Sequence, residues 1–218
     1  MNKIGLLFDM DGVIVDNHRY HFLSWQKMAE EYQMSITEEF YRNQMNGRTF
    51  TSIIEVMLKK KMPPSEAKKI AYEKECIYRE LYQEHLKPTD GLITFLEEAK
   101  SKEIPMVVGT SAPVENVAFT LDGLDIRHYF RGVIDDRAVS KGKPNPEVYL
   151  NCASMIKRNP TSCVVFEDAV SGIGAGKAAG AKVIALATSH KRKELDADLI
   201  VDNFTEINLE IIYQVLNS

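Results

Sequence analysis

The sequence predicts an α/β fold, a doubly wound parallel sheet with a small helical domain inserted after its first strand. Short apolar runs such as residues 4–8 and 163–166 have the length and composition of buried strands in a parallel sheet. Segments with helical periodicity separate these runs, as parallel strands require. Between residues 17 and 86 the pattern is helical almost throughout and carries no strand signal. We therefore expect a core domain at 1–15 and 87–218 and a helical domain at 16–86.

Bulk properties exclude several classes of protein. The chain has 218 residues, 44% hydrophobic and 27% charged, which suits one full core and a smaller insert. A net charge of −4 argues against nucleic acid as a partner. The three cysteines, Cys76, Cys152 and Cys163, are too widely spaced for a zinc pattern or a disulfide framework. The apolar run at the start is too short for a signal peptide and no stretch suits a membrane span, so we expect a cytoplasmic protein, a monomer without a membrane partner.

The insert is predicted to contain several helices in succession. Ser35 and Glu38 have the spacing of a capping box that begins a second helix, and Thr49 can cap a third. A long helix is expected at residues 66–85, after a pair of prolines. The first helix is indicated by an apolar stripe at helical spacing, formed by Phe22, Trp25, Ala29 and Tyr32.

The second half of the chain alternates between strands and helices. Its first helix has a buried stripe at Leu92, Phe95, Leu96 and Ala99. The glycine-rich run within residues 171–179 has the wrong spacing for a nucleotide fingerprint, and we expect it inside a helix that packs closely on the sheet. A helix at 207–216 closes the chain. The expected strands are residues 104–109, 132–135, 163–166, 182–187 and 199–201.

Two carboxylates, Asp9 and Asp11, follow the first strand and precede Gly12. Open α/β sheets bind ligands beyond the carboxyl ends of their strands, and residues two apart on a strand point the same way. A divalent cation is the natural counter-charge for such a pair. The alternatives are a plain turn and a calcium loop, and the calcium loop fails because its third acidic position and distal Glu are missing.

Further polar residues follow later strands. Thr110 and Ser111 come after the strand at 104–109, where a hydroxyl and free N–H groups can bind an anion or simply cap a helix. Lys143 stands between the strand at 132–135 and a helix that begins with prolines, whose rigidity would aim its side chain. Glu167 and Asp168 follow the strand at 163–166. The fold thus predicts that these side chains converge.

These motifs, in this order, resemble those of the haloacid dehalogenase superfamily, and within it the β-phosphoglucomutase-like and sugar-phosphatase-like branch with a helical cap. The resemblance covers essentially all 218 residues. It implies a Rossmann-like core of the superfamily's type, with the insert as its cap, and an enzyme that transfers a phosphoryl group of a small phosphate ester.

The resemblance also implies a role for each core residue. Asp9 would be the nucleophile that forms an aspartyl phosphate, and Asp11 the general acid and base. Mg²⁺ would be held by Asp9, the main-chain carbonyl of Asp11 and Asp168, with Glu167 close by. The transferring phosphoryl group would be bound by Thr110 and Lys143.

Four residues of the predicted cap are candidate substrate contacts. His21, Trp25 and Lys74 match cap and hinge positions of β-phosphoglucomutases, although Trp25 is also explained by core packing and Lys74 by a solvated helix face. Arg48, in a predicted loop, is a candidate phosphate contact or an ordinary surface arginine. Together with Ser111 these residues are the candidate substrate contacts.

A phosphatase acting on a sugar phosphate is the favoured function, with Mg²⁺ as cofactor. The mutases carry polar residues that hold a second phosphate after the second motif, where this chain has Ala112, Pro113 and Val114. A β-phosphoglucomutase remains an alternative, and the Gly47-Arg48-Thr49 loop keeps an inorganic pyrophosphatase open. A non-catalytic phosphate-binding protein is disfavoured because such a protein would not need Asp11 as a proton shuttle.

Overall fold

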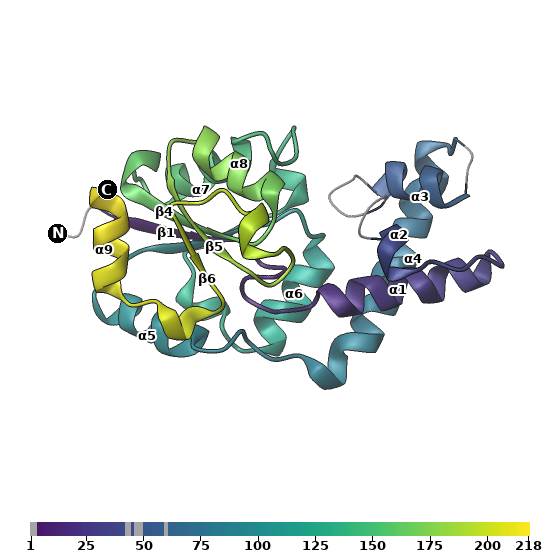
Figure 1. Ribbon diagram of the computed structural model, residues 1–218, viewed down its shortest axis with the longest axis horizontal. Coiled ribbons are helices and arrows are strands. Elements are labelled where there is room, and N and C mark those ends of the chain that lie inside the picture. The colour runs from purple at the N-terminus through teal and green to yellow at the C-terminus, as the bar shows by residue number, and fades with distance from the viewer. Residues whose placement is uncertain (1–3, 42–44, 46–49, 59–60) are drawn as a thin grey trace. The chain divides into compact units, whose positions relative to one another are not determined.

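The computed structural model describes residues 4–41, 45, 50–58 and 61–218 (Figure 1). The chain divides into two compact units, a core unit of Met1–Asp16 and Leu86–Ser218 and a cap unit of Asn17–His85. Each boundary lies one residue from the boundary expected from the sequence. We describe the two units separately.

A six-stranded parallel sheet forms the centre of the core unit, with the strand order β3-β2-β1-β4-β5-β6. This is the order of a doubly wound Rossmann-like sheet, as predicted. Each strand begins and ends within two residues of its expected position. The strands are β1 (Gly5–Phe8), β2 (Met106–Gly109), β3 (Val133–Ile134), β4 (Cys163–Glu167), β5 (Lys182–Leu186) and β6 (Leu199–Val201).

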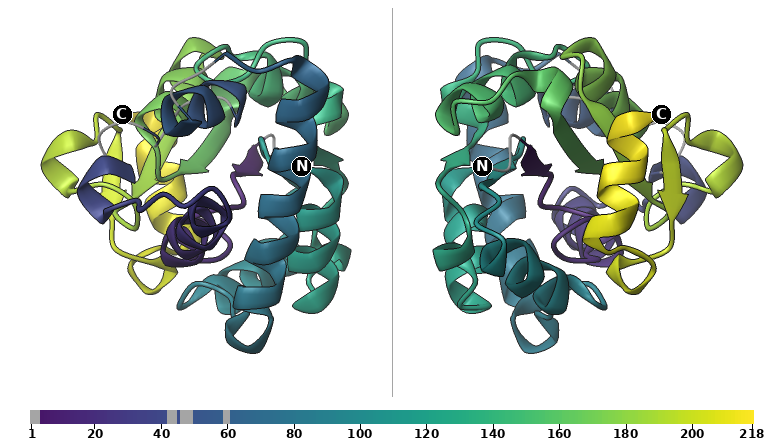
Figure 2. Two further views of the ribbon diagram at one scale, coloured as in Figure 1. Left: turned by 90° about the vertical axis from the view of Figure 1, so that its right-hand side faces the viewer. Right: turned by 90° about the vertical axis from the view of Figure 1, so that its left-hand side faces the viewer.

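Helices cover both faces of this sheet (Figures 1 and 2). The helices of the core unit are α5 (Leu92–Ser101), α6 (Val114–Gly123), α7 (Glu147–Met155), α8 (Val170–Ala178) and α9 (Leu209–Asn217). The glycine-rich run lies inside α8, as expected. Short 3-10 turns complete the unit at Arg127–Tyr129, Asp136–Ala138, Pro160–Ser162, Arg192–Glu194 and Phe204–Glu206.

Side chains of the central strands alternate between the two faces of the sheet, so they pack into two different hydrophobic clusters. Leu7 of β1 and Val165 of β4 pack in one cluster with Tyr149 and Cys152 of α7. Phe8 belongs to an aromatic cluster that also contains Phe95, Phe130, Phe166 and Phe204. Since successive side chains of a strand point to opposite faces, the residue after Phe8 returns to the α7 face. Asp9 and Glu167 therefore lie on that face, two residues beyond Leu7 and Val165.

The cap unit consists of α1 (His18–Glu31), α2 (Glu38–Phe40), α3 (Phe50–Leu58), α4 (Pro64–Tyr82) and a 3-10 turn at Gln83–His85. The predicted capping box of Ser35 and Glu38 is wrong, because Thr37 caps α2 by accepting the N–H of Phe40 at 3.1 Å. A hydrophobic cluster holds the unit together, with Trp25, Met28, Ala29, Ile36, Met45, Ile53, Ile54, Met57, Met62, Ala67 and Ile70 as its buried members.

Candidate active site

The site lies where the strand order reverses, between β1 and β4. Phe8 pairs with Phe166, and the N–H of Asp9 donates to the carbonyl of Phe166 at 2.9 Å. The chain then leaves β1 through Gly12, whose φ of 77° suits glycine. Glu167, the last residue of β4, is thereby brought beside Asp9, which it follows by more than 150 positions in the sequence. Ligands of open α/β sheets bind at this kind of switch point.

Lys143 joins the two carboxylates. Its Nζ donates to Asp9 Oδ1 and to Glu167 Oε1, both at 2.6 Å. The same Nζ lies 3.4 Å from the main-chain oxygen of Gly109, the last residue of β2. The side chain of Lys143 is only 9% exposed. Burial alone would lower the pKa of Lys143, but the two carboxylates outweigh burial and raise it, so Lys143 carries its charge.

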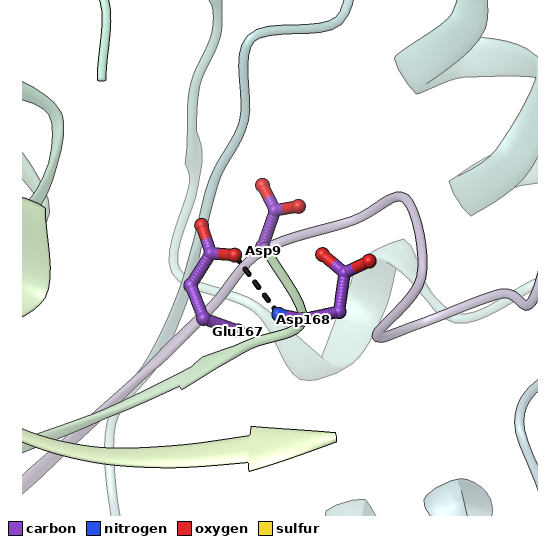
Figure 3. A group of neighbouring side chains, drawn as sticks. All are labelled: Asp9, Glu167 and Asp168. Carbon is purple, nitrogen blue, oxygen red and sulfur yellow. Dashed lines mark hydrogen bonds between the residues drawn. The ribbon is translucent and has the colours of Figure 1, made fainter. Parts of the chain in front are cut away.

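Three carboxylates meet in this place. The nearest oxygens of Asp9, Glu167 and Asp168 lie within 4.8 Å of one another, and all three residues are buried (Figure 3). Burial raises the pKa of Asp9 well above its usual value, more than Lys143 lowers it, and the charges of Glu167, Asp168 and Asp11 raise it further. When all three are ionised, their negative charges exceed the single positive charge of Lys143. Hard oxygen donors with this charge suit a divalent ion such as Mg²⁺.

Glu167 accepts four hydrogen bonds. Its Oε1 accepts from Lys143 at 2.6 Å and from the hydroxyl of Tyr149 at 2.7 Å. Its Oε2 accepts the N–H groups of Asp168 and Ala169 at 2.9 and 3.1 Å, the first of which is drawn in Figure 3. Burial, followed by the charges of Glu167 and Asp9, raises the pKa of Tyr149 well above its usual value, so the phenol remains a donor.

The other core residues predicted from the sequence occupy adjacent loops. Thr110 directly follows Gly109, is 2% exposed, and accepts the N–H of Ala112 at 3.0 Å, so it stabilises the turn after β2. Ser111 is exposed. Asp11 is half-buried in the loop after β1, close enough to Asp9 to raise its pKa.

Several residues that the sequence did not indicate hold these loops. Thr188, after β5, donates to the main-chain oxygen of Gly12 at 2.7 Å, and Ser189 donates to that of Asp168 at 2.8 Å. Both residues follow the carboxyl end of β5, and this position could have indicated them from the sequence. Tyr149 had no comparable signal, because it lies inside α7 and resembles an ordinary core residue.

Two candidate residues of the cap unit, His21 and Lys74, contact each other within that unit. Lys74 is 2% exposed, so its interpretation as a solvated charge is wrong. Its Nζ lies 2.7 Å from His21 Nδ1 and 2.9 Å from Glu75 Oε1. The His21 ring stacks on Tyr78 with ring centres 4.1 Å apart. The sequence could not reveal this burial, because it arises from the packing of α1 against α4.

Trp25, the remaining cap candidate that the structure describes, is 2% exposed and packs in the hydrophobic cluster of the cap unit. Its ring lies 5.5 Å from the Nζ of Lys74. Arg48 lies outside the described residues.

Within the part of the chain that is described, no helix is both long and apolar enough to cross a membrane.

The fold and the site define a class of protein, α/β enzymes that carry carboxylates at the switch point of a parallel sheet. Comparison with known proteins identifies the family. Residues 6–186 match the model of the haloacid dehalogenase-like hydrolases, so the chain belongs to this family. Its homologues are phosphatases and phosphomutases, and the chain is an enzyme of this phosphotransferase type.

Individual relatives cover nearly the whole chain. The β-phosphoglucomutase of Bacillus subtilis is 29% identical over 96% of this chain and 93% of its own. The phosphorylated carbohydrates phosphatase of Thermotoga maritima is 34% identical over 80% of this chain and 81% of its own. A solved structure of a HAD hydrolase, family IA, variant 3, from Entamoeba histolytica superposes with a TM-score of 0.93 at 30% identity, covering 99% of this chain and 100% of the other.

Proposed function

We propose that this enzyme is a Mg²⁺-dependent phosphatase that hydrolyses a small phosphomonoester, a sugar phosphate, through an aspartyl phosphate at Asp9. The observation that carries the proposal is the buried ion pair of Asp9 and Lys143, 2.6 Å long, beside Glu167 and Asp168. A carboxylate nucleophile needs a fixed cation to approach an anionic phosphate. The ammonium of Lys143 supplies that cation, and Asp168 offers a carboxylate ligand for a metal.

Each residue has a defined role in the proposed reaction. A carboxylate oxygen of Asp9 attacks phosphorus, and the bond between phosphorus and the ester oxygen breaks. The carboxyl group of Asp11 gives its proton to the departing oxygen, then takes a proton from the water that attacks the aspartyl phosphate. Release of inorganic phosphate restores Asp9. Lys143 balances the charge of the phosphoryl oxygens, and Thr110 helps to bind them.

Mg²⁺ fits the donor set described above. It would be held by Asp9, Asp168 and the main-chain carbonyl of Asp11, with Glu167 beside them. The bound ion supplies charge neutralisation and orientation of the phosphoryl group.

Hydrolysis is favoured over mutase activity by the residues after β2. Ala112 is 6% exposed, and Pro113 and Val114 begin α6 without a polar side chain. A mutase must hold two phosphates of a sugar bisphosphate, and this stretch offers no side-chain donor for the second one. The phosphatase from Thermotoga maritima, named for phosphorylated carbohydrates, and the fructose-1-phosphate phosphatase YqaB of Escherichia coli, 31% identical over 81% of this chain, support the same choice.

A β-phosphoglucomutase is the second candidate, favoured by the cap unit. His21 and Lys74 correspond to mutase cap residues in the family resemblance, and they form a buried contact of 2.7 Å. The mutase of Bacillus subtilis covers 96% of this chain, whereas the two phosphatases named above cover 80% and 81%. The loop that left a pyrophosphatase open, residues 47–49, lies outside the described residues.

Phosphorus NMR separates these functions. We would incubate the protein with Mg²⁺, β-glucose 1-phosphate and a trace of glucose 1,6-bisphosphate. Free phosphate that is absent with Asp9→Asn is the expected result and would lead to a panel including fructose 1-phosphate. Glucose 6-phosphate without free phosphate would identify a mutase. If no ester of the panel reacts, the phosphatase proposal is wrong.

A further inference from the structure

Tyr149 of α7 contacts two residues of the candidate active site, Glu167 and Lys143. It is fully buried, and its hydroxyl donates to Glu167 Oε1 at 2.7 Å. Its ring also lies under Lys143, with the Nζ 5.1 Å from the ring centre. One side chain therefore touches both partners of the ion pair between Lys143 and Glu167. Hydrophobic packing alone needs no hydroxyl at this position, since phenylalanine would fill the same space.

The hydroxyl completes the acceptor positions of Glu167. A carboxylate has about four lone-pair positions, and Lys143 and two main-chain N–H groups occupy three of them. Tyr149 occupies the fourth. A buried carboxylate bonded on all sides is fixed in place, whereas one with an unfilled position pays a desolvation cost and can rotate to reduce it.

Gly172 of α8 supplies the space for this arrangement. A Cβ atom at Gly172 would overlap the carboxylate of Glu167, closer than any allowed contact. Gly174, two positions further on, would meet only Pro144 at 3.4 Å. The small residue at 172 is thus required by the position of Glu167, in addition to the packing of α8 on the sheet.

We infer that Tyr149 is a positioning residue for phosphoryl transfer, acting through Glu167 to fix the ammonium of Lys143 against Asp9. The step that it serves is the attack of Asp9 on phosphorus, where a displaced ammonium would leave the developing charge unbalanced. The inference rests on the proposed function for its kinetic consequence. Its structural consequence, a fixed Lys143, is independent of the substrate.

The test replaces Tyr149 by Phe in the full-length protein, which removes only the hydroxyl. The control is Val148→Ala, which opens a cavity next to Tyr149 in α7; Val148 is 3% exposed, belongs to the same hydrophobic cluster and has no polar side-chain atom. Hydrolysis of 4-nitrophenyl phosphate with saturating Mg²⁺ gives kcat and KM. We expect kcat of Tyr149→Phe to fall about tenfold with KM unchanged within about twofold, because the contact acts in the chemical step. Val148→Ala should lower the melting temperature and keep kcat.

A second measurement observes Lys143 directly. In protein labelled with ¹⁵N-lysine, its buried ammonium should give a slowly exchanging NMR signal, assigned by its loss in Lys143→Arg. We expect Tyr149→Phe to shift and broaden this signal and Val148→Ala to leave it unchanged. An unchanged signal in Tyr149→Phe, an unchanged kcat, or an equal fall of kcat in Val148→Ala would overturn the inference. If the wild type hydrolyses no phosphate ester, the proposed function fails, and the Lys143 signal alone then decides the role of Tyr149.

Discussion

At the scale of single residues, Lys143 allows the carboxylates of Asp9 and Glu167 to lie close together in a buried site. Two carboxylates brought together by β1 and β4 repel each other, and the ammonium between them reduces this repulsion by contacting both at 2.6 Å. The sequence predicted Lys143 as a member of the site because it stands in a proline-rich loop after a strand. The pairing with Glu167 could not be predicted, since it depends on which oxygen of which acid the lysine reaches.

Replacement of Lys143 by Met should abolish most of the activity. We expect kcat to fall about 10²- to 10³-fold, the usual effect of removing one preorganised group that stabilises transition-state charge. Lys141→Met is the matched control, because Lys141 lies in the same loop and is exposed. The measurement is kcat of both variants from steady-state kinetics with one phosphate ester. A Lys143→Met enzyme as active as Lys141→Met would exclude Lys143 from the chemistry.

At the scale of elements, α8 illustrates what the sequence can and cannot predict. Its glycine-rich run was assigned correctly to a helix packed on the sheet, because the spacing excluded a nucleotide-binding loop. A Cβ at Gly176 would lie 2.9 Å from Val183 and 3.3 Å from Val165, a close approach that only packed coordinates reveal. Lys74 was misjudged for a related reason. Its neighbours in sequence are acidic, but in space Lys74 also lies against His21 and Trp25 of another helix, α1.

The glycines of α8 should therefore differ in their response to alanine. Gly176→Ala crowds β4 and β5, so we expect the free energy of unfolding to fall by about 1–3 kcal/mol. Gly174→Ala meets only Pro144 at 3.4 Å, and the higher helix propensity of alanine should raise stability by about 0.5–1 kcal/mol. Urea unfolding of both variants measures the difference. If the two variants were equally stable, the close packing of α8 on the sheet would be refuted.

At the scale of the whole molecule, each of the two units brings polar side chains close together. The core unit carries the carboxylates and Lys143, and the cap unit carries Lys74 with His21 and Glu75. The fold class was predictable because strand and helix periods alternate along the chain and the insert lacks strands. The burial of Lys74 in the cap unit was not predictable, because it arises only from folding.

Under the proposed function, the cap cluster affects specificity more than chemistry. Lys74→Gln should raise KM for the best sugar phosphate about tenfold, while kcat for 4-nitrophenyl phosphate changes less than about twofold. Lys69→Gln serves as the control, since Lys69 lies on the same helix with its side chain 76% exposed. Parallel kinetics with the two esters test this division. If Lys74→Gln lowered kcat/KM equally for both esters, Lys74 would have a general structural role.

The proposed mechanism requires that Asp9 becomes phosphorylated during turnover. The most direct measurement is to quench the enzyme with acid in the steady state, digest it, and locate the phosphoryl group by mass spectrometry. We expect a phosphorylated peptide that contains Asp9, formed only with Mg²⁺ and a reactive phosphate ester, and missing in Asp9→Asn. Rapid formation of free phosphate without modification of Asp9 at any quench time would contradict a mechanism through an aspartyl phosphate at Asp9.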